Sequence, residues 1–376
     1  MSKSVQTPPL NSPPPPTPRA LAAKLDKPSI WHAIWERSGI LLVFLAIAVG
    51  CSVFVDGFFS LANARGLLLS VATIGTIACT MLFCLASGDF DLSVGSVVAL
   101  SGVTAAVVTN STQNAFLGIS AGLLVGAVVG TANGVVIAIF GINALITTLA
   151  TMQIARGMAF LVSDGKSVPV PSSTFNDLGG ASLGDLSWLA WLGETGSFGK
   201  WLLSLTSPIW IVLGCFVLFG VLLNKTIFGR NTLAIGGNKE AAKLAGIPVR
   251  FTKILIFALQ GTMAGFAGVI LASRFHSGQP NTSLGLELQV ISACVLGGVS
   301  LTGGVGNMWG VVLGVLIMGM VENAMKLQNI PFFWQSVTSG SILLAAVLFD
   351  RLKQVGGWRA VWAFFLKLTG SSSRSG

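Results

Sequence analysis

Charged side chains are scarce in this sequence: Asp, Glu, Lys and Arg make up 9% of its 376 residues. A soluble domain has about a quarter of its residues charged. Hydrophobic residues account for 53%, so the composition argues against a soluble domain and favours a protein embedded in lipid. Histidine is also scarce, with only His32 and His276. No His, Cys or Ser group has catalytic or metal-ligand spacing, which disfavours a membrane-embedded enzyme and a metal site.

The sequence has five cysteines and lacks a nucleotide-binding motif. Each cysteine falls in an apolar stretch, which is typical of small buried hydrophobic residues rather than disulfides; they are Cys51, Cys79, Cys84, Cys215 and Cys294. The run from Gly193 to Trp201 imitates a phosphate-binding loop, but it has one residue too many between its glycines. Trp201 also stands where a Ser or Thr must reach magnesium. We expect no cofactor and no ATPase site in this chain.

Long apolar stretches are abundant. A helix needs about 20 mostly apolar residues to cross the bilayer, and its backbone hydrogen bonds must close within the helix. The sequence predicts an all-α polytopic membrane protein with about ten transmembrane helices, some of them broken or re-entrant. The shorter spans 93–109 and 287–301 are the candidates for such helices. The predicted spans are residues 39–55, 67–86, 93–109, 115–140, 143–162, 206–223, 254–273, 287–301, 308–326 and 332–349.

Composition divides the chain into three regions. Residues 1–38 form a Pro-rich tail and an interfacial segment, residues 39–350 a transmembrane domain, and residues 351–376 a C-terminal tail. Most of the 22 Lys and Arg residues fall in the two tails and in the segment 224–253, so the positive-inside rule places both termini in the cytoplasm. Attraction to anionic membrane lipid explains the net charge of +9 without a nucleic-acid partner.

Two carboxylates interrupt the apolar pattern between the second and third predicted spans. Asp89 and Asp91 lie among glycines in the run 87–96. A charge at membrane depth is costly unless it faces water or a partner group. We therefore interpret Asp89, Asp91 and Ser93 as lining a substrate pathway. The competing interpretation is that Asp91 only caps a helix that begins at Leu92.

A second interruption is the glycine-rich stretch 294–306. Paired interruptions in the two halves of a transporter indicate a central transport site built from an internal repeat. Close packing of helices through small residues is the alternative explanation. Residue identity between the two interruptions is too poor to establish a repeat.

The fifth predicted span carries a polar face. Asn143, Thr147 and Thr151 recur every four residues, which places them on one side of a helix and suits neutral hydrogen bonding to a sugar. Hydrogen bonding between helices explains the same pattern. Arg156, toward the outer end of the span, is expected either to extend its charge to the membrane surface or to bind a carboxylate such as Glu322.

The polar segment 224–253 is basic and helix-forming. Its run from Glu240 to Gly246 has the pattern Glu-Ala-Ala-x-x-x-Gly, and Pro248 follows as a helix stop. A short helix with small alanine side chains fits a groove on a partner and moves as a rigid unit. An amphipathic loop helix without a partner is the alternative. We predict a cytoplasmic loop that couples to an ATPase through Glu240, Ala241, Ala242 and Gly246.

This pattern is similar to the docking loop in membrane subunits of ATP-binding-cassette importers. Four stretches, residues 87–96, 142–151, 229–238 and 292–300, resemble the monosaccharide permeases of ribose, xylose and arabinose import systems. The likeness covers about residues 40–350 and is strongest to the L-arabinose members.

The resemblance implies a homodimeric permease of the bacterial inner membrane that carries a monosaccharide, L-arabinose, and performs no covalent chemistry. It also implies two protein partners, a cytoplasmic ATPase and a periplasmic sugar-binding protein. The residues themselves leave an ion-coupled secondary sugar transporter open. In that transporter Asp89 and Asp91 would bind the coupling ion, and no docking loop would be needed.

Overall fold

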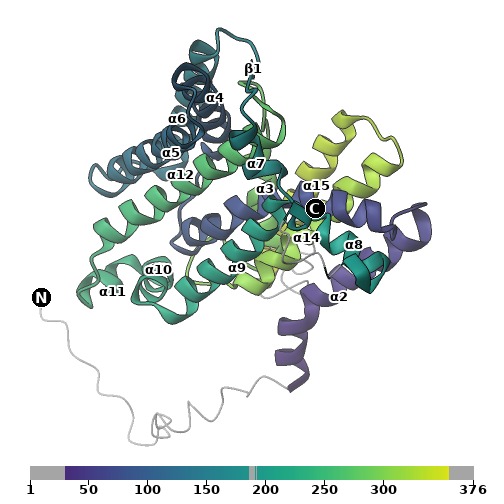
Figure 1. Cartoon of the computed structure of the whole chain (residues 1–376). Coiled ribbons are helices and arrows are strands. Elements are labelled where there is room, and N and C mark those ends of the chain that lie inside the picture. The colour runs from purple at the N-terminus through teal and green to yellow at the C-terminus, as the bar shows by residue number, and fades with distance from the viewer. Residues whose placement is uncertain (1–29, 186–190, 192, 355–376) are drawn as a thin grey trace, which may run out of the picture.

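The computed structural model describes residues 30–185, 191 and 193–354. The predictions for residues 1–29 and 355–376, which cover most of both tails, lie outside the described residues. Coiled helices form nearly all of the regular structure that is described (Figure 1).

Long or apolar helices alternate along the chain with short connecting elements. The long or apolar helices are α2 (Ile30–Phe54), α3 (Leu61–Ala86), α4 (Val94–Thr112), α5 (Ala115–Ala138), α6 (Ala144–Val162), α9 (Ser207–Lys225), α12 (Val249–Arg274), α13 (Leu286–Leu296), α14 (Met308–Leu327) and α15 (Phe332–Gln354). The connecting elements are β1 (Val168–Pro169), α7 (Ser173–Gly180), η1 (Leu183–Asp185), α8 (Ser197–Leu203), α10 (Ile227–Gly237), α11 (Lys239–Leu244) and β2 (Ser277–Gly278).

The predicted all-α polytopic membrane architecture is confirmed for the described part of the chain. Seven helices there are long and apolar enough to cross a membrane. Three shorter apolar stretches of helix accompany them, namely Gly39–Phe54, Leu286–Leu296 and Phe333–Leu348. The protein is therefore a multi-pass membrane protein.

The two spans predicted to be broken or re-entrant differ in the structure. The prediction for 93–109 is wrong, because α4 continues without interruption from Val94 to Thr112 and the break precedes it. The prediction for 287–301 is confirmed in that α13 is short and ends at Leu296. Gly298 follows with a φ of +82°, a conformation that other residues rarely adopt, so the helix stops there.

Helices α5 and α12 pack backbone against backbone. Gly126 and Gly130 on α5 face Gly261 and Gly265 on α12: a Cβ added to Gly126 would lie 2.8 Å from the Cα of Gly265. A Cβ added to Gly261 would lie 2.6 Å from the Cα of Gly130. Close approach through small residues gives van der Waals contact that lipid cannot replace. This pair of helices is therefore a rigid part of the membrane domain.

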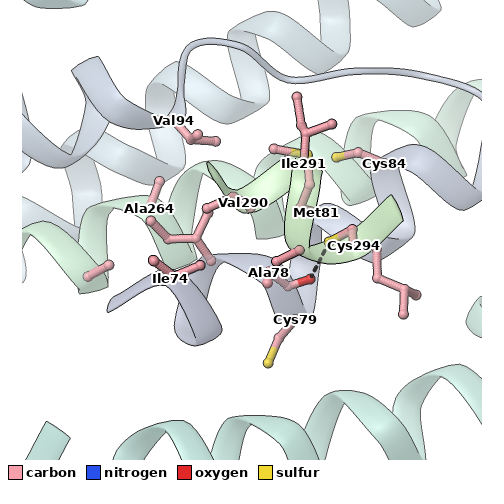
Figure 2. Packing of buried hydrophobic residues seen from close by; sticks show 14 of the residues in the cluster. Ile74, Ala78, Cys79, Met81, Cys84, Val94, Ala264, Val290, Ile291 and Cys294 are labelled. Atoms are coloured by element: carbon pink, nitrogen blue, oxygen red, sulfur yellow. Dashed lines mark hydrogen bonds between the residues drawn. The ribbon is translucent and has the colours of Figure 1, made fainter. Parts of the chain in front are cut away.

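The buried core joins α3, α4, α12 and α13. Figure 2 shows Ile74 and Met81 of α3 beside Val290 and Ile291 of α13. The thiol of Cys294 on α13 donates a weak hydrogen bond to the carbonyl oxygen of Ala78, with sulfur and oxygen 3.7 Å apart. Cys79, Cys84, Cys215 and Cys294 are buried, as predicted for small hydrophobic residues, whereas Cys51 is half-buried.

The connecting elements gather at two ends of the helical domain. Strands β1 and β2 pair antiparallel, with Val168 opposite Gly278. Helix α7 packs at the same end, because a Cβ on Gly179 would lie 2.7 Å from the backbone nitrogen of Arg274. Helices α10 and α11 lie at the other end of α12 (Figure 1). The segment before α12 and the segment after it thus lie at opposite ends of the domain, as expected for a helix that crosses the membrane once.

Candidate functional site at the helix breaks

The first break, defined as residues 87–93, connects α3 to α4 and is buried. Asp91 is 1% exposed. Its Oδ1 accepts hydrogen bonds from the backbone N–H of Ser93 at 2.9 Å and from the Ser93 hydroxyl at 2.6 Å. Helix α4 begins at Val94, with Ser93 in the N-cap position. The capping interpretation, in which Asp91 begins a helix at Leu92, is therefore wrong in position: Asp91 holds the turn that leads into the helix.

Asp89 in the same break is bound to a different part of the chain. Its Oδ2 lies 2.5 Å from the ammonium nitrogen of Lys253, near the start of α12. The Ser87 hydroxyl donates a longer hydrogen bond of 3.5 Å to the same oxygen. Both members of the ion pair are buried. A buried charge is stable only with such a partner, so the pair fixes the first break to α12.

A chain of hydrogen bonds extends from the first break across two further helices. The Thr151 hydroxyl on α6 donates to the side-chain oxygen of Asn133 on α5, at 2.6 Å. The Asn133 amide donates to the Ser93 hydroxyl at 3.2 Å, and Ser93 donates to Asp91. Each donor points toward the carboxylate, and such bonds polarise one another. The sequence interpretation missed Asn133, whose signal is a lone amide in the apolar stretch 115–140.

The other two residues of the predicted α6 face have local roles. Asn143 is exposed and caps α6, since its side-chain oxygen accepts from the backbone N–H of Leu145 at 2.8 Å. The Thr147 hydroxyl donates to the carbonyl oxygen of Asn143, within the same helix. Of the three predicted residues, Thr151 alone forms a side-chain hydrogen bond to another helix of the described structure. The structure thus brings Thr151, but not Asn143 or Thr147, to the first break.

Arg156 does not bind Glu322, so that prediction is wrong. The Arg156 guanidinium donates to the carbonyl oxygens of Pro280 and Thr282, at 2.7 and 2.8 Å. Glu322 instead accepts from the side-chain amide of Gln289 at 2.5 Å. Carbonyl oxygens in an irregular turn have no backbone partner of their own, which makes them available to a guanidinium. Arg156 therefore fixes the turn that precedes α13.

The second break, defined as residues 297–307, touches the first break through backbone atoms. The N–H of Gly304 donates to the carbonyl oxygen of Ala86 at 2.9 Å. A Cβ added to Gly303 would lie 2.9 Å from the backbone nitrogen of Gly88 and 2.9 Å from the Cα of Gly236 on α10. The two breaks and the end of α10 thus form one junction.

The coupling segment, defined as residues 226–248, contains α10 and α11. The Asn238 side chain accepts the N–H of Ala241 at 2.9 Å and begins α11. Ala242 is buried against Ile235 and Val249, whereas Glu240 and Ala241 are exposed. Gly246 has a φ of +81° and ends the short helix in open space. The predicted run therefore does form a helix, which presents Glu240 outward while Ala242 anchors it.

Comparison with known proteins assigns the chain to a family of membrane transport proteins. The chain matches the family model described as the branched-chain amino acid transport system / permease component over residues 63–347. The L-arabinose transport system permease protein AraH of Escherichia coli K12 is 56% identical over 321 residues, which cover 85% of this chain and 92% of that protein.

Two further relatives cover similar lengths. The L-arabinose ABC transporter permease protein AraH of Azospirillum brasilense is 51% identical over 335 residues, covering 89% of this chain and 93% of that protein. The ribose import permease protein RbsC of Haemophilus influenzae is 36% identical over 317 residues, covering 84% and 93%. No solved structure matches this chain.

The apolar helices define a polytopic membrane protein, and the match to a permease family makes it a membrane transport protein. Within this class, the chain belongs to the family of branched-chain amino acid transport system permease components, which its match over residues 63–347 establishes.

Proposed function

We propose that this chain is the membrane-spanning permease subunit of an ATP-driven importer for L-arabinose. The observation that carries the proposal is its 56% identity to the Escherichia coli L-arabinose permease across 92% of that protein. The ribose permease of Haemophilus influenzae is less similar, at 36% identity. The description of the family names branched-chain amino acids, so leucine is included among the substrates to be tested.

In this proposal two copies of the chain form a homodimer in the bacterial inner membrane. A cytoplasmic ATPase docks on the coupling segment, where Glu240 and Ala241 are exposed and Gly246 shapes the turn. A periplasmic sugar-binding protein delivers the sugar to the opposite end, near α7 and the β1–β2 pair. ATP hydrolysis is assigned to the partner, because the sequence contains no complete phosphate-binding motif.

The substrate pathway is proposed to pass the polar residues of the first break and of α6. Asn143 is exposed and Thr151 partly exposed, so the Asn143 amide can donate hydrogen bonds to a sugar and the Thr151 hydroxyl oxygen can accept one, its hydrogen being donated to Asn133. Thr147 is nearly buried and contributes less. Asp89, Asp91 and Ser93 are buried and already bonded, so they act by holding the helix ends that border the pathway.

The orientation with both termini in the cytoplasm is tested by labelling. Lys166→Cys and Lys239→Cys are placed singly in a cysteine-free background, since both side chains are exposed and lie at opposite ends of the protein. An impermeant maleimide added to cells with a permeabilised outer membrane should label the first variant and spare the second. Labelling of Lys239→Cys alone would reverse the orientation.

The transport function is tested in proteoliposomes that contain this chain, its ATPase and its binding protein. We expect uptake of L-arabinose only when ATP is present on the side of the membrane that carries the ATPase. This uptake should exceed the uptake of ribose and of leucine. Uptake by the chain alone under a proton or sodium gradient, without the ATPase, would instead establish the ion-coupled alternative.

A further inference from the structure

The region of the first break is contacted by Gly236, inside the coupling segment, and by Lys253, on the part of α12 that follows the segment. On the α10 side, Gly236 lies so close to the break that an added Cβ would overlap the carbonyl oxygen of Ala86. On the α12 side, Lys253 forms its ion pair with Asp89. Helix α11 (Lys239–Leu244) lies between these attachments in the chain. Ala86, the last residue of α3, and Asp89, in the first break, thus contact the chain on either side of α11.

The two attachments differ in the forces that they can transmit. The contact at Gly236 is a van der Waals contact between backbones, which resists approach steeply and separation only weakly. The ion pair of Asp89 and Lys253 is a charge-assisted hydrogen bond of 2.5 Å in a buried environment. Such a bond resists separation, because pulling it apart leaves two uncompensated buried charges. The first attachment therefore transmits a push, and the second transmits a pull.

Motion of the first break is expected to move α4. Asp91, two residues after Asp89, holds the turn that begins α4 through both donors of Ser93. The same Ser93 is hydrogen-bonded to α5 through Asn133. A displacement that reaches Asp89 therefore passes through three residues of backbone to the start of a membrane-spanning helix.

We propose that the Asp89–Lys253 ion pair is the contact through which movement of the coupling segment pulls on the first break, and that Asp89 and Lys253 are positioning residues for transport. This inference rests on the proposed function, in that it requires an ATPase docked on the coupling segment. It assigns to Asp89 a partner inside the protein in place of a sugar or a coupling ion.

The test compares variants of the pair in the reconstituted complex of permease, ATPase and binding protein. Lys253→Met removes the charge and keeps an unbranched side chain, Lys253→Arg conserves the charge, and the double variant Asp89→Lys/Lys253→Asp exchanges the charges. Lys326→Met is the matched control, because Lys326 forms a longer and more exposed pair with Glu322, at 3.7 Å on α14.

Sugar uptake, basal ATP hydrolysis and hydrolysis stimulated by the loaded binding protein are measured on each assembled complex. We expect Lys253→Met to keep basal hydrolysis and to lose roughly tenfold in sugar transported per ATP, a typical strength of coupling between sites. Lys253→Arg and the exchanged pair should restore part of this ratio, and the control should match the wild type.

A wild-type ratio in Lys253→Met, or an exchanged pair that assembles normally and stays uncoupled, would overturn the inference. Failure of all Asp89 and Lys253 variants to assemble, with a normal Lys326→Met control, would overturn it as well, because the pair would then be needed for folding. If the wild-type complex itself shows no ATP-dependent uptake, the proposed function fails. If the wild type transports and the variants stay coupled, the inference alone fails.

Discussion

The two breaks occupy the same junction and are built from opposite chemistry. The first break holds two buried carboxylates, each with its own cationic or hydrogen-bonding partner. The second break holds no carboxylate between residues 297 and 307, and its contacts to the first break and α10 run through glycine backbone. An ion pair therefore binds the first break to α12, whereas the second break is held by close backbone contacts and a backbone hydrogen bond.

This difference affects how each break tolerates change. A buried carboxylate can be replaced by a side chain of similar shape that keeps its acceptors, so its role can be examined by graded substitution. A glycine in backbone contact has no such series, because any Cβ must displace the neighbouring chain. The predictions below run from the steric contact, with the largest expected effect, to the hydrogen-bond chain, with the smallest.

The largest effect is expected at the steric side of the junction. In Gly236→Val the new side chain would overlap the carbonyl oxygen of Ala86 and lie close to the backbone nitrogen of Gly304. Overpacking of this kind costs about 3 kcal/mol, so the melting temperature and yield of the purified protein should fall strongly.

Gly237→Val is the matched control, because a Cβ on that neighbouring residue meets nothing within 4 Å. It should retain the melting temperature of the wild type, because valine has a somewhat higher helix propensity than glycine and meets no neighbouring atom there. Equal destabilisation by both substitutions would show that the contact between α10 and the first break is not tight.

The carboxylate side of the comparison is examined at Asp91. Asp91→Ala removes the acceptor of two buried donors of Ser93, which costs about 2 kcal/mol in the free energy of unfolding. Asp91→Asn keeps an oxygen in the same place and should lose less than half as much. Denaturation of the purified protein measures both values. An Asn variant as unstable as the Ala variant would mean that the negative charge, and not the acceptor, stabilises the turn.

Much of this architecture could be predicted from the sequence, because apolar stretches and their lengths report directly on membrane spans. Helices α4 to α6 follow the predicted ranges closely, whereas α3 ends as predicted at Ala86 but begins at Leu61, earlier than the predicted residue 67. The start of α12 at Val249, earlier than the predicted residue 254, was missed because Arg250 and Lys253 look like loop residues in a hydropathy profile. Lys253 is buried only because Asp89 neutralises it, and that contact joins residues far apart in the sequence.

The candidate site was predictable in its residue types and not in its contacts. Asp89 and Asp91 stood out as charges in an apolar chain, yet their partners come from α12 and from the next turn. Asn133 was overlooked because a single amide in a long apolar stretch has no periodic pattern. Sequence spacing indicates which residues share a helix face. Only the packing of α5 against α6 and against the start of α4 shows that Thr151 and Ser93 both bond to the side chain of Asn133.

Gly246 allows the cost of a left-handed backbone conformation to be measured without the cost of a steric clash. Gly303 and Gly246 both have positive φ, but Gly303 is in backbone contact and Gly246 lies in open space. Gly246→Ala should therefore cost only about 1 kcal/mol, the penalty of the left-handed conformation itself. Gly246→Asn should cost less, since Asn adopts this conformation more readily.

The measurement at Gly246 combines thermal unfolding with transport by the reconstituted complex. We expect Gly246→Ala to assemble normally and to reduce ATPase stimulation and uptake together, with Gly246→Asn closer to the wild type. Unchanged stimulation in Gly246→Ala would show that the shape of this turn does not matter for docking.

The smallest expected effect concerns the hydrogen bonds that connect the first break to neighbouring helices. Thr151, Asn133 and Ser93 form a chain of hydrogen bonds that ends at Asp91. Within the described residues, the side-chain hydrogen bonds of Ser300 and Thr302 stay inside the second break. Side-chain hydrogen bonds between membrane helices contribute about 0.6 kcal/mol on average.

A double-mutant cycle of Asn133→Leu and Thr151→Val should therefore give a coupling energy near that value. A cycle of Asn133→Leu with Thr147→Val should give none, because the Thr147 hydroxyl bonds within its own helix. Equal coupling in both cycles would mean that α6 responds as a unit, and that the first break does not reach it through Asn133.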